Sequence, residues 1–181
     1  MRLAPLLNAA LVIAAACARE PARDRPASAT AGDSGFAALQ SRGADPRAMR
    51  VDQYTSVHRF DVLPDGGRIE LQRDVDDSAG VSQIRRHLRA IADAFAVGDF
   101  GTPAFVHMRQ MPGTAVMAAK RSVIGYAVRD LPRGAELRIT TSDPAAVAAV
   151  HAFMASQRTD HRAGGIGDGS AAPLAHPHAS P

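Results

Sequence analysis

Two pairs of short segments alternate between apolar and polar residues, which is the pattern of half-buried β-strands. The first pair covers residues 57–62 and 68–72, and the second covers residues 123–128 and 136–140. Proline and glycine separate the two members of each pair and supply the geometry of a turn. We therefore expect two β-hairpins.

Each hairpin is followed by apolar residues at helical spacing. After the first hairpin they recur every three or four positions, at Val81, Ile84, Leu88, Ile91 and Phe95. Asp77 and Ser78 precede this stripe as candidate N-caps. The second helix is expected to begin at Ser142-Asp143-Pro144 and to run through Val147, Val150 and Met154 toward His161.

The second strand of each hairpin has one apolar and one charged face. The apolar residues are Ile69 and Leu71 in one strand and Leu137 and Ile139 in the other. One face of the sheet should therefore face water while the helices cover the other. The pattern predicts an α+β fold: a two-layer, antiparallel sheet of two hairpins, covered on one face by two helices (ββαββα).

A long connection, residues 96–122, separates the two halves. Long connections within small domains often carry functional residues. A short helix over residues 115–121 that simply packs on the domain is the alternative.

The first 17 residues resemble a secretory signal, with one positive charge followed by a short apolar run and small residues. The run is too short to cross a bilayer. Cys17 follows Ala14-Ala15-Ala16, where lipoprotein signals place the cysteine that receives lipid. We expect an exported protein, periplasmic or in the outer membrane, that contacts the membrane through a lipid anchor on Cys17. Simple secretion after cleavage behind Ala16 or Ala18 is the alternative.

Composition divides the rest of the chain into three parts. Residues 18–50 and 163–181 are rich in Ala, Pro, Gly and polar residues without apolar periodicity, so we expect a disordered tether and a disordered tail. A short helical turn near residues 36–40 is the alternative within the tether. Residues 51–162 have the length of one domain. Cys17 is the only cysteine, so this domain cannot form an internal disulfide.

Charge argues against a nucleic-acid-binding protein. The chain has 21 Lys and Arg residues against 18 Asp and Glu residues, and the acidic residues are interspersed among the basic ones. Aromatic residues do not alternate with basic residues along any strip, as they do in many nucleic-acid-binding surfaces. No nucleophile elbow, phosphate loop or zinc-protease motif occurs either.

The histidines are the candidate chemical groups. His87 and His151 lie at the borders of the two apolar helix stripes, and His107 lies in the long connection. With Met117 as a further ligand, these three could bind copper or zinc, or a small ligand. His161 is expected to lie outside this site, because ten residues of helix separate it from His151 by about 15 Å.

Two other hypotheses for the function of the domain remain open. The histidines could be structural and the domain a non-catalytic protein-interaction module, since half-buried imidazoles often bond a neighbouring carbonyl. Alternatively, the domain could be a small hydrolase that uses His107 or His151 as its base.

Several short motifs occur in a fixed order between about Asp65 and His161. They are Ile84-x-x-His87-Leu88, Phe95 with Gly98-Asp99-Phe100, Pro103-x-Phe105-x-His107, Pro112-Gly113-x-x-x-Met117, and Val150-His151-x-Phe153 running to Gln157 and Asp160-His161. In these motifs the chain resembles a group of small bacterial exported proteins of unknown function. The resemblance implies export, but no activity, substrate or ligand.

Some members of that group are labelled aspartate carbamoyltransferase. Such an enzyme needs two α/β domains and a Ser-Thr-Arg-Thr segment that binds phosphate, and this chain is too short and lacks the segment. The nearest counterpart of the enzyme's His-Pro-x-Gln element is His176-Pro177-His178-Ala179, which has no glutamine. The residues therefore argue against carbamoyltransferase activity.

Overall fold

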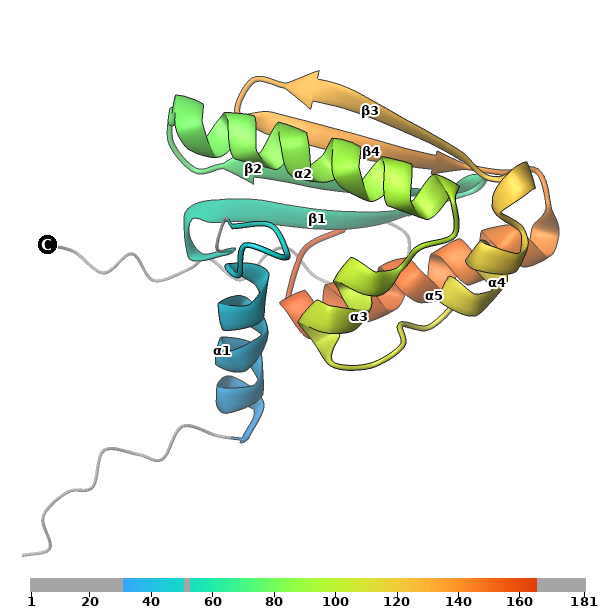
Figure 1. The fold of residues 1–181 in the computed structure, drawn as a ribbon, viewed down its shortest axis with the longest axis horizontal. Coiled ribbons are helices and arrows are strands. Elements are labelled where there is room, and N and C mark those ends of the chain that lie inside the picture. The colour runs from blue at the N-terminus through green and yellow to red at the C-terminus, as the bar shows by residue number, and fades with distance from the viewer. Residues whose placement is uncertain (1–30, 51–52, 166–181) are drawn as a thin grey trace, which may run out of the picture.

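The computed structural model describes residues 31–50 and 53–165. At its centre is a four-stranded antiparallel sheet with the strand order β1-β2-β4-β3 (Figure 1). The strands are β1 (Ser56–Leu63), β2 (Gly66–Arg73), β3 (Gly125–Leu131) and β4 (Gly134–Thr140). They form two hairpins joined edge to edge by β2 and β4. The predicted α+β fold is confirmed.

Two long helices cover one face of this sheet. They are α2 (Ser78–Ala96) and α5 (Pro144–His161). Helix α2 lies mainly over β3 and β4, whereas α5 lies over β1 and β2 (Figure 1). Each long helix therefore packs mainly on the hairpin that it does not follow in sequence, which interlocks the two halves.

Both long helices begin at the predicted capping residues. The Asp77 side chain accepts a hydrogen bond of 3.1 Å from the Gly80 amide, and Asp143 accepts one of 2.9 Å from the Ala146 amide. Pro144 occupies the first turn of α5, where its missing N–H costs nothing. Each cap pairs a backbone N–H that the first turn of a helix leaves without an intrahelical partner, which stabilises the helix.

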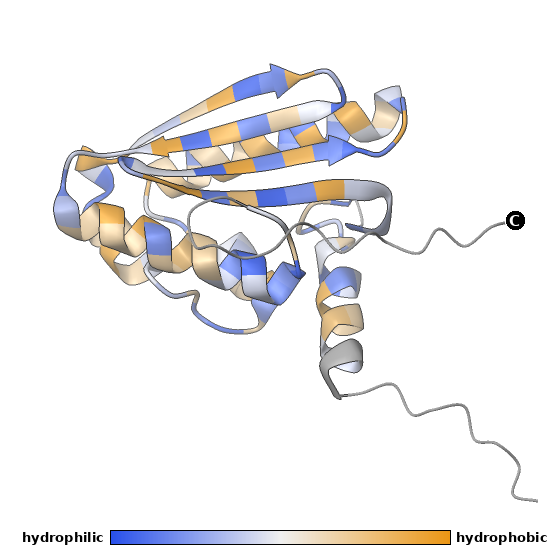
Figure 2. Cartoon of the chain, turned by 180° about the vertical axis from the view of Figure 1, so that it is seen from behind, coloured by the Kyte–Doolittle hydropathy of each residue, from blue (hydrophilic) through white to orange (hydrophobic). Residues whose placement is uncertain are grey.

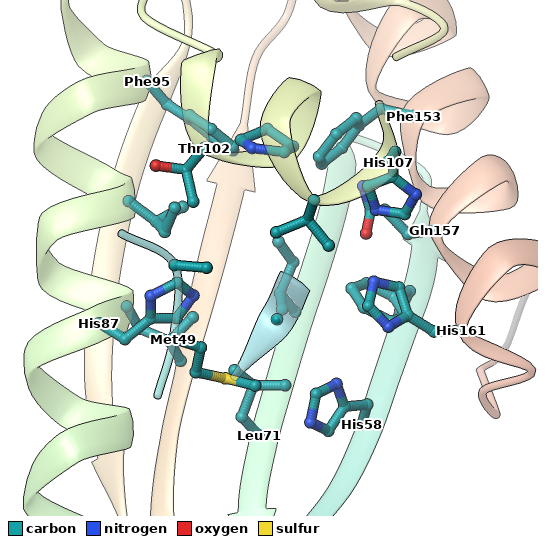
Figure 3. Close-up of a pocket in the computed structure, with 18 residues that line it drawn as sticks. Met49, His58, Leu71, His87, Phe95, Thr102, His107, Phe153, Gln157 and His161 are labelled. Carbon is teal, nitrogen blue, oxygen red and sulfur yellow. The ribbon is translucent and has the colours of Figure 1, made fainter. Parts of the chain in front are cut away.

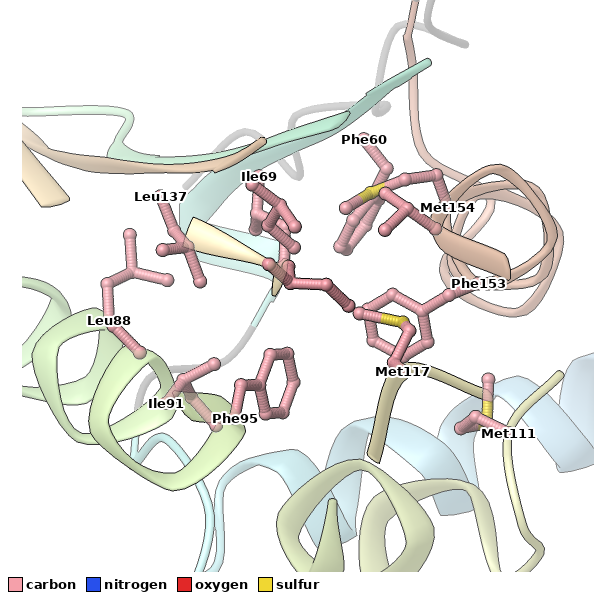
Figure 4. Packing of buried hydrophobic residues seen from close by; sticks show 14 of the residues in the cluster. Phe60, Ile69, Leu88, Ile91, Phe95, Met111, Met117, Leu137, Phe153 and Met154 are labelled. Carbon is pink, nitrogen blue, oxygen red and sulfur yellow. The ribbon is translucent and has the colours of Figure 1, made fainter. Parts of the chain in front are cut away.

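The core fills the space between the sheet and the helices (Figure 4). Its fully buried residues include Leu137 and Ile139 from the sheet, Ile84 and Phe95 from α2, and Val150, Phe153 and Met154 from α5. The opposite face of the sheet is polar, and hydrophilic and hydrophobic residues alternate along its strands (Figure 2). There Arg68 lies 2.5 Å from Asp61 and Arg129 lies 3.0 Å from Glu136. The predicted division into a polar face and a covered face is thus observed.

The long connection contains two short helices, α3 (Gly101–His107) and α4 (Thr114–Ala119), followed by the 3-10 turn η2 (Arg121–Val123). Helix α4 corresponds to the short helix expected at residues 115–121. Helix α3 has only seven residues, too few to show helical periodicity in the sequence.

The described part of the expected tether is folded. Residues 31–50 contain helix α1 (Ala31–Gly43), and the 3-10 turn η1 (Gln53–Thr55) precedes β1. Met49 is buried in the core, and its carbonyl accepts a hydrogen bond of 2.9 Å from Gln83 on α2. Arg42 donates from Nε to the Val106 carbonyl of α3 over 2.6 Å. These contacts join residues 31–50 to the domain, whereas the signal segment and residues 18–30 lie outside the described residues.

The first residues of the expected tail also pair with the domain. Gly164 forms a parallel bridge to β1, and its carbonyl accepts a hydrogen bond of 3.0 Å from the Phe60 amide. Residues 166–181 of the expected tail lie outside the described residues. Within the part of the chain that is described, no helix is both long enough and apolar enough to cross a membrane.

Candidate functional site: a cavity lined by histidines

A cavity of about 90 Å³ lies between the sheet and the helices (Figure 3). Strands β1 and β2 form its floor, helices α2, α3 and α5 form its walls, and the loop after α1 closes one side. Most of the lining is apolar and includes Phe60, Leu71, Phe95, Val106 and Phe153. Four imidazoles interrupt this apolar surface: His58, His87, His107 and His161.

His58 lies on β1, on the same face as Phe60. Strand alternation places both side chains toward the helices, and His58 is only 6% exposed. Its Nε2 lies 3.0 Å from the Ser56 hydroxyl. This hydrogen bond fixes one ring nitrogen of His58.

His107 is the last residue of α3. Met108 after it adopts a left-handed conformation (φ 54°), which ends the helix. His107 Nδ1 lies 2.7 Å from the Asp160 carboxylate, which also accepts a hydrogen bond of 2.6 Å from Arg109. Because a carboxylate only accepts, the hydrogen of the neutral imidazole lies on Nδ1 and leaves Nε2 as an acceptor.

His161 is the last residue of α5 and lies between the two preceding imidazoles. Its ring centroid is 5.7 Å from that of His58 and 5.1 Å from that of His107. His161 Nδ1 is 3.0 Å from Gln53 Oε1, and this oxygen also accepts a hydrogen bond of 2.7 Å from Gln40 on α1. Helix α1 therefore helps to fix the imidazole of His161 through Gln53.

His87 faces these three imidazoles from α2, on the other side of the cavity (Figure 3). Burial lowers its pKa to about 4, although a hydrogen bond to the backbone of Ala48 opposes this effect. Ala48 belongs to the loop after α1. His87 thus connects the closing loop to the wall of the cavity.

Burial keeps all four imidazoles uncharged at neutral pH. It lowers the pKa of His58 to about 3 and that of His161 well below the ordinary value. Burial also lowers the pKa of His107, against the opposing effect of Asp160. A neutral imidazole has one hydrogen-bond donor and one acceptor, so the cavity presents polar groups without a net positive charge.

Gln157 on α5 adds an amide to the same wall. It is 5% exposed and lines the cavity. A hydrogen bond between its side chain and His107 opposes the lowering of the pKa of His107, whereas among the described residues its Nε2 has no hydrogen-bond partner. Buried polar groups are nearly always paired, so an unpaired donor in a cavity wall is a natural contact for a bound molecule.

The structure does not bring together the four residues predicted for a metal site. His87 and His107 line the cavity, but His151 does not, and its Nε2 lies 2.9 Å from the Leu63 carbonyl instead. Met117 is fully buried in the core. Among the described residues, no group of three or more His, Cys, Asp or Glu side chains is arranged to hold a metal ion, so the expected copper or zinc has no assembled ligand set there.

His161, expected outside the site, is instead part of it. The helix does separate it from His151, as helical rise requires, but the cavity lies at the end of α5 where His161 stands. His58 and Gln157 were not predicted. The alternation of residues 57–62 indicates that His58 and Phe60 lie on the same, covered face of the sheet, so the sequence could have pointed to a buried His58.

No protein-family model, curated protein or solved structure shows significant similarity to the chain. The resemblance to small exported bacterial proteins therefore stays a prediction. The geometry of the cavity is the basis for a functional assignment.

Proposed function

We propose that this domain binds a small, mostly apolar organic molecule in the histidine-lined cavity. The observation that supports the proposal is an apolar cavity wall that carries three closely spaced neutral imidazoles and the Gln157 amide, whose Nε2 has no partner among the described residues. Ligand pockets commonly combine an apolar lining with a few polar groups that orient the ligand. The histidines thus act as a recognition surface in this proposal.

The size and charge of the cavity limit the ligand. Its volume of about 90 Å³ is smaller than the roughly 150 Å³ of an engineered cavity that admits benzene. Because benzene has six non-hydrogen atoms, an apolar part of fewer than about six should fit without movement of the walls. Because Gln157 offers a donor, the ligand should carry an acceptor such as a carbonyl oxygen.

Titration with cyclopentanone tests the proposal, because this probe has six non-hydrogen atoms and one carbonyl acceptor. We expect NMR shift changes in the methyl groups of Val106, Leu71 and Leu88 and in the Gln157 side-chain amide, all of which line the cavity. The methyl groups of Val75 and Val123, which are exposed, should not shift. Equal shifts in both sets, or none in the cavity, would rule the proposal out.

A pair of matched variants shows whether the cavity is the site. Ala48 lines the cavity, whereas Ala44 in the same loop is exposed and does not. Ala48→Phe should fill part of the cavity and weaken cyclopentanone binding about tenfold or more, while Ala44→Phe should leave it unchanged. Equal affinities for the two variants would contradict the assignment.

The location of the protein belongs to the same proposal. Because the first residues resemble a lipoprotein signal, the domain would bind its ligand in the cell envelope, anchored through Cys17. Cys17 lies outside the described residues.

Acid–base chemistry at His107 is a second candidate function. The carboxylate of Asp160 orients the imidazole through Nδ1, as a carboxylate does in serine hydrolases. With Nε2 as an acceptor, His107 could activate a water molecule against an ester. Hydrolysis of p-nitrophenyl acetate tests this, with His107→Asn abolishing the activity and His151→Asn retaining it. Equal rates for the two variants would exclude a role for His107.

A further inference from the structure

A second, larger hollow adjoins the cavity at His107. This surface cleft of about 390 Å³ lies between α1 and the C-terminal end of α5. Its lining includes Leu39, Arg42, Arg109, Asp160 and Arg162, together with His107. His107 lines both hollows, and the end of α1 also borders both, since Arg42 lies in the cleft and Gly43 in the cavity.

The cleft is positively charged. Among the described residues, three arginines and one carboxylate, that of Asp160, line it. That carboxylate is already engaged by Arg109 at 2.6 Å and by His107 at 2.7 Å. A second anion in the cleft would therefore meet guanidinium groups that Asp160 does not engage.

Arg42 is the arginine best placed to meet an anion. Its Nε donates to the Val106 carbonyl, which holds the side chain against α3. Among the described residues its two terminal nitrogens have no hydrogen-bond partner, so they can donate to an anion while Nε stays bonded to Val106. Arg162 lies with its guanidinium 4.6 Å from the centre of the Phe36 ring, which fixes a second positive charge at the cleft.

We propose that the cavity and the cleft form one site for a small carboxylate with an apolar tail. The tail occupies the cavity, and the carboxylate lies in the cleft near Arg42 and Arg162. A planar guanidinium can bond both oxygens of a carboxylate, which favours this anion. This inference rests on the proposed binding function and adds the chemical class of the head group. The acceptor for Gln157 is then a second polar group on the tail, which the simple probes below do not carry.

Neutral imidazoles fit the same arrangement. A charged cluster at the inner end of the site would draw the anion into the cavity, whereas uncharged histidines leave the arginines as the cations among the described lining residues. The apolar lining of the cavity then selects the tail, and the arginines select the head. His107 lies between the apolar cavity and the charged cleft, so the ligand binds with its tail in the cavity and its carboxylate in the cleft.

Hexanoate and hexanamide test the inference, because they have the same shape and differ in charge. Their affinities for the full-length protein are measured by NMR titration at low and at high salt. We expect hexanoate to bind at least about fivefold more tightly than hexanamide at low salt, with a smaller ratio at high salt. Equal affinities at low salt would overturn the inference.

Three variants localise the effect. Arg42→Gln and Arg162→Gln should each reduce the preference for hexanoate, while Arg86→Gln on the exposed surface of α2 changes the net charge equally and should retain it. An equal reduction by Arg86→Gln would mean that only the overall charge matters and would overturn the assignment. Binding of cyclopentanone separates the two proposals. If it binds in the cavity while hexanoate shows no preference over hexanamide, only the carboxylate site fails, and if it does not bind, the binding function fails as well.

Discussion

The buried imidazoles differ from the ordinary surface histidine in that each has a defined partner. Ser56 holds His58, Asp160 holds His107, and Gln53 holds His161, in each case through one ring nitrogen. His107 also forms a hydrogen bond with the Gln157 side chain. Burial makes the charged form of each ring costly, so the cluster is built for the neutral state.

Acid should destabilise the fold because of these histidines. His58 and His87 have pKa values of about 3 and 4 in the folded state, below the value of 6.5 that they have when unfolded. The unfolded chain therefore binds protons first as the pH falls. The stabilisation is complete above pH 6.5 and is lost progressively between pH 6.5 and about 3.

His87 alone should account for about 3 kcal/mol of this loss, because each tenfold reduction in the proton affinity of a folded group corresponds to about 1.4 kcal/mol. Urea unfolding between pH 7 and pH 4 measures it. His87→Gln should flatten the pH dependence, whereas His151→Gln, outside the cavity, should not. A wild-type free energy of unfolding that stays constant over this range would contradict the burial of neutral imidazoles.

Asp160 opposes the effect of burial on the pKa of His107. Its carboxylate raises the pKa of His107 and so limits the lowering that burial causes. Asp160→Asn should therefore lower the pKa of His107 further, as measured by NMR titration of the imidazole, while Asp93→Asn on the exposed surface of α2 should not. An unchanged or raised pKa in Asp160→Asn would show that the two side chains do not interact.

Among the elements, those with a repeating pattern were predictable and those held by scattered contacts were not. The alternation of residues 57–62 predicted β1, and the Asp77 and Asp143 caps predicted the starts of α2 and α5. Helix α1 has no such signal. Its segment is fixed by single residues such as Leu39 and Met49, whose partners lie far away in sequence.

Met49 provides a test of this segment. It is 8% exposed, packs in the core and lines the cavity. Met49→Ala should cost about 2 kcal/mol or more of unfolding free energy. Met108→Ala, at a residue that is 70% exposed, should change stability by about 0.5 kcal/mol or less in the same thermal or urea unfolding experiment. A similar effect of both substitutions would show that residues 31–50 do not pack as described.

For the whole molecule, the site depends on contacts between both halves of the chain. The cavity is lined by residues of β1 and β2, of the two long helices, of α3 and of the loop after α1. Sequence spacing could relate His151 to His161 along one helix, but it could not show which end of α5 meets α3. His87 and His107 were therefore identified from the sequence. The alternation of β1 indicated the face on which His58 lies, but only the tertiary fold shows that His58 and His161 lie beside His107.

Membrane attachment is also a property of the whole chain. If Cys17 carries lipid, the full-length protein expressed in a bacterial host should be found in the membrane fraction. Cys17→Ser should move it to the soluble fraction, because the anchor is lost. An equal distribution of both forms in the soluble fraction would mean that the protein is simply secreted.

The central claim is that the histidine-lined cavity is a ligand site. A crystal structure of the protein soaked with cyclopentanone tests it most directly. We predict density for the ring in the cavity, with the carbonyl oxygen within hydrogen-bond distance of Gln157 Nε2. A cavity that stays empty, or that closes by movement of the loop after α1, would contradict the account.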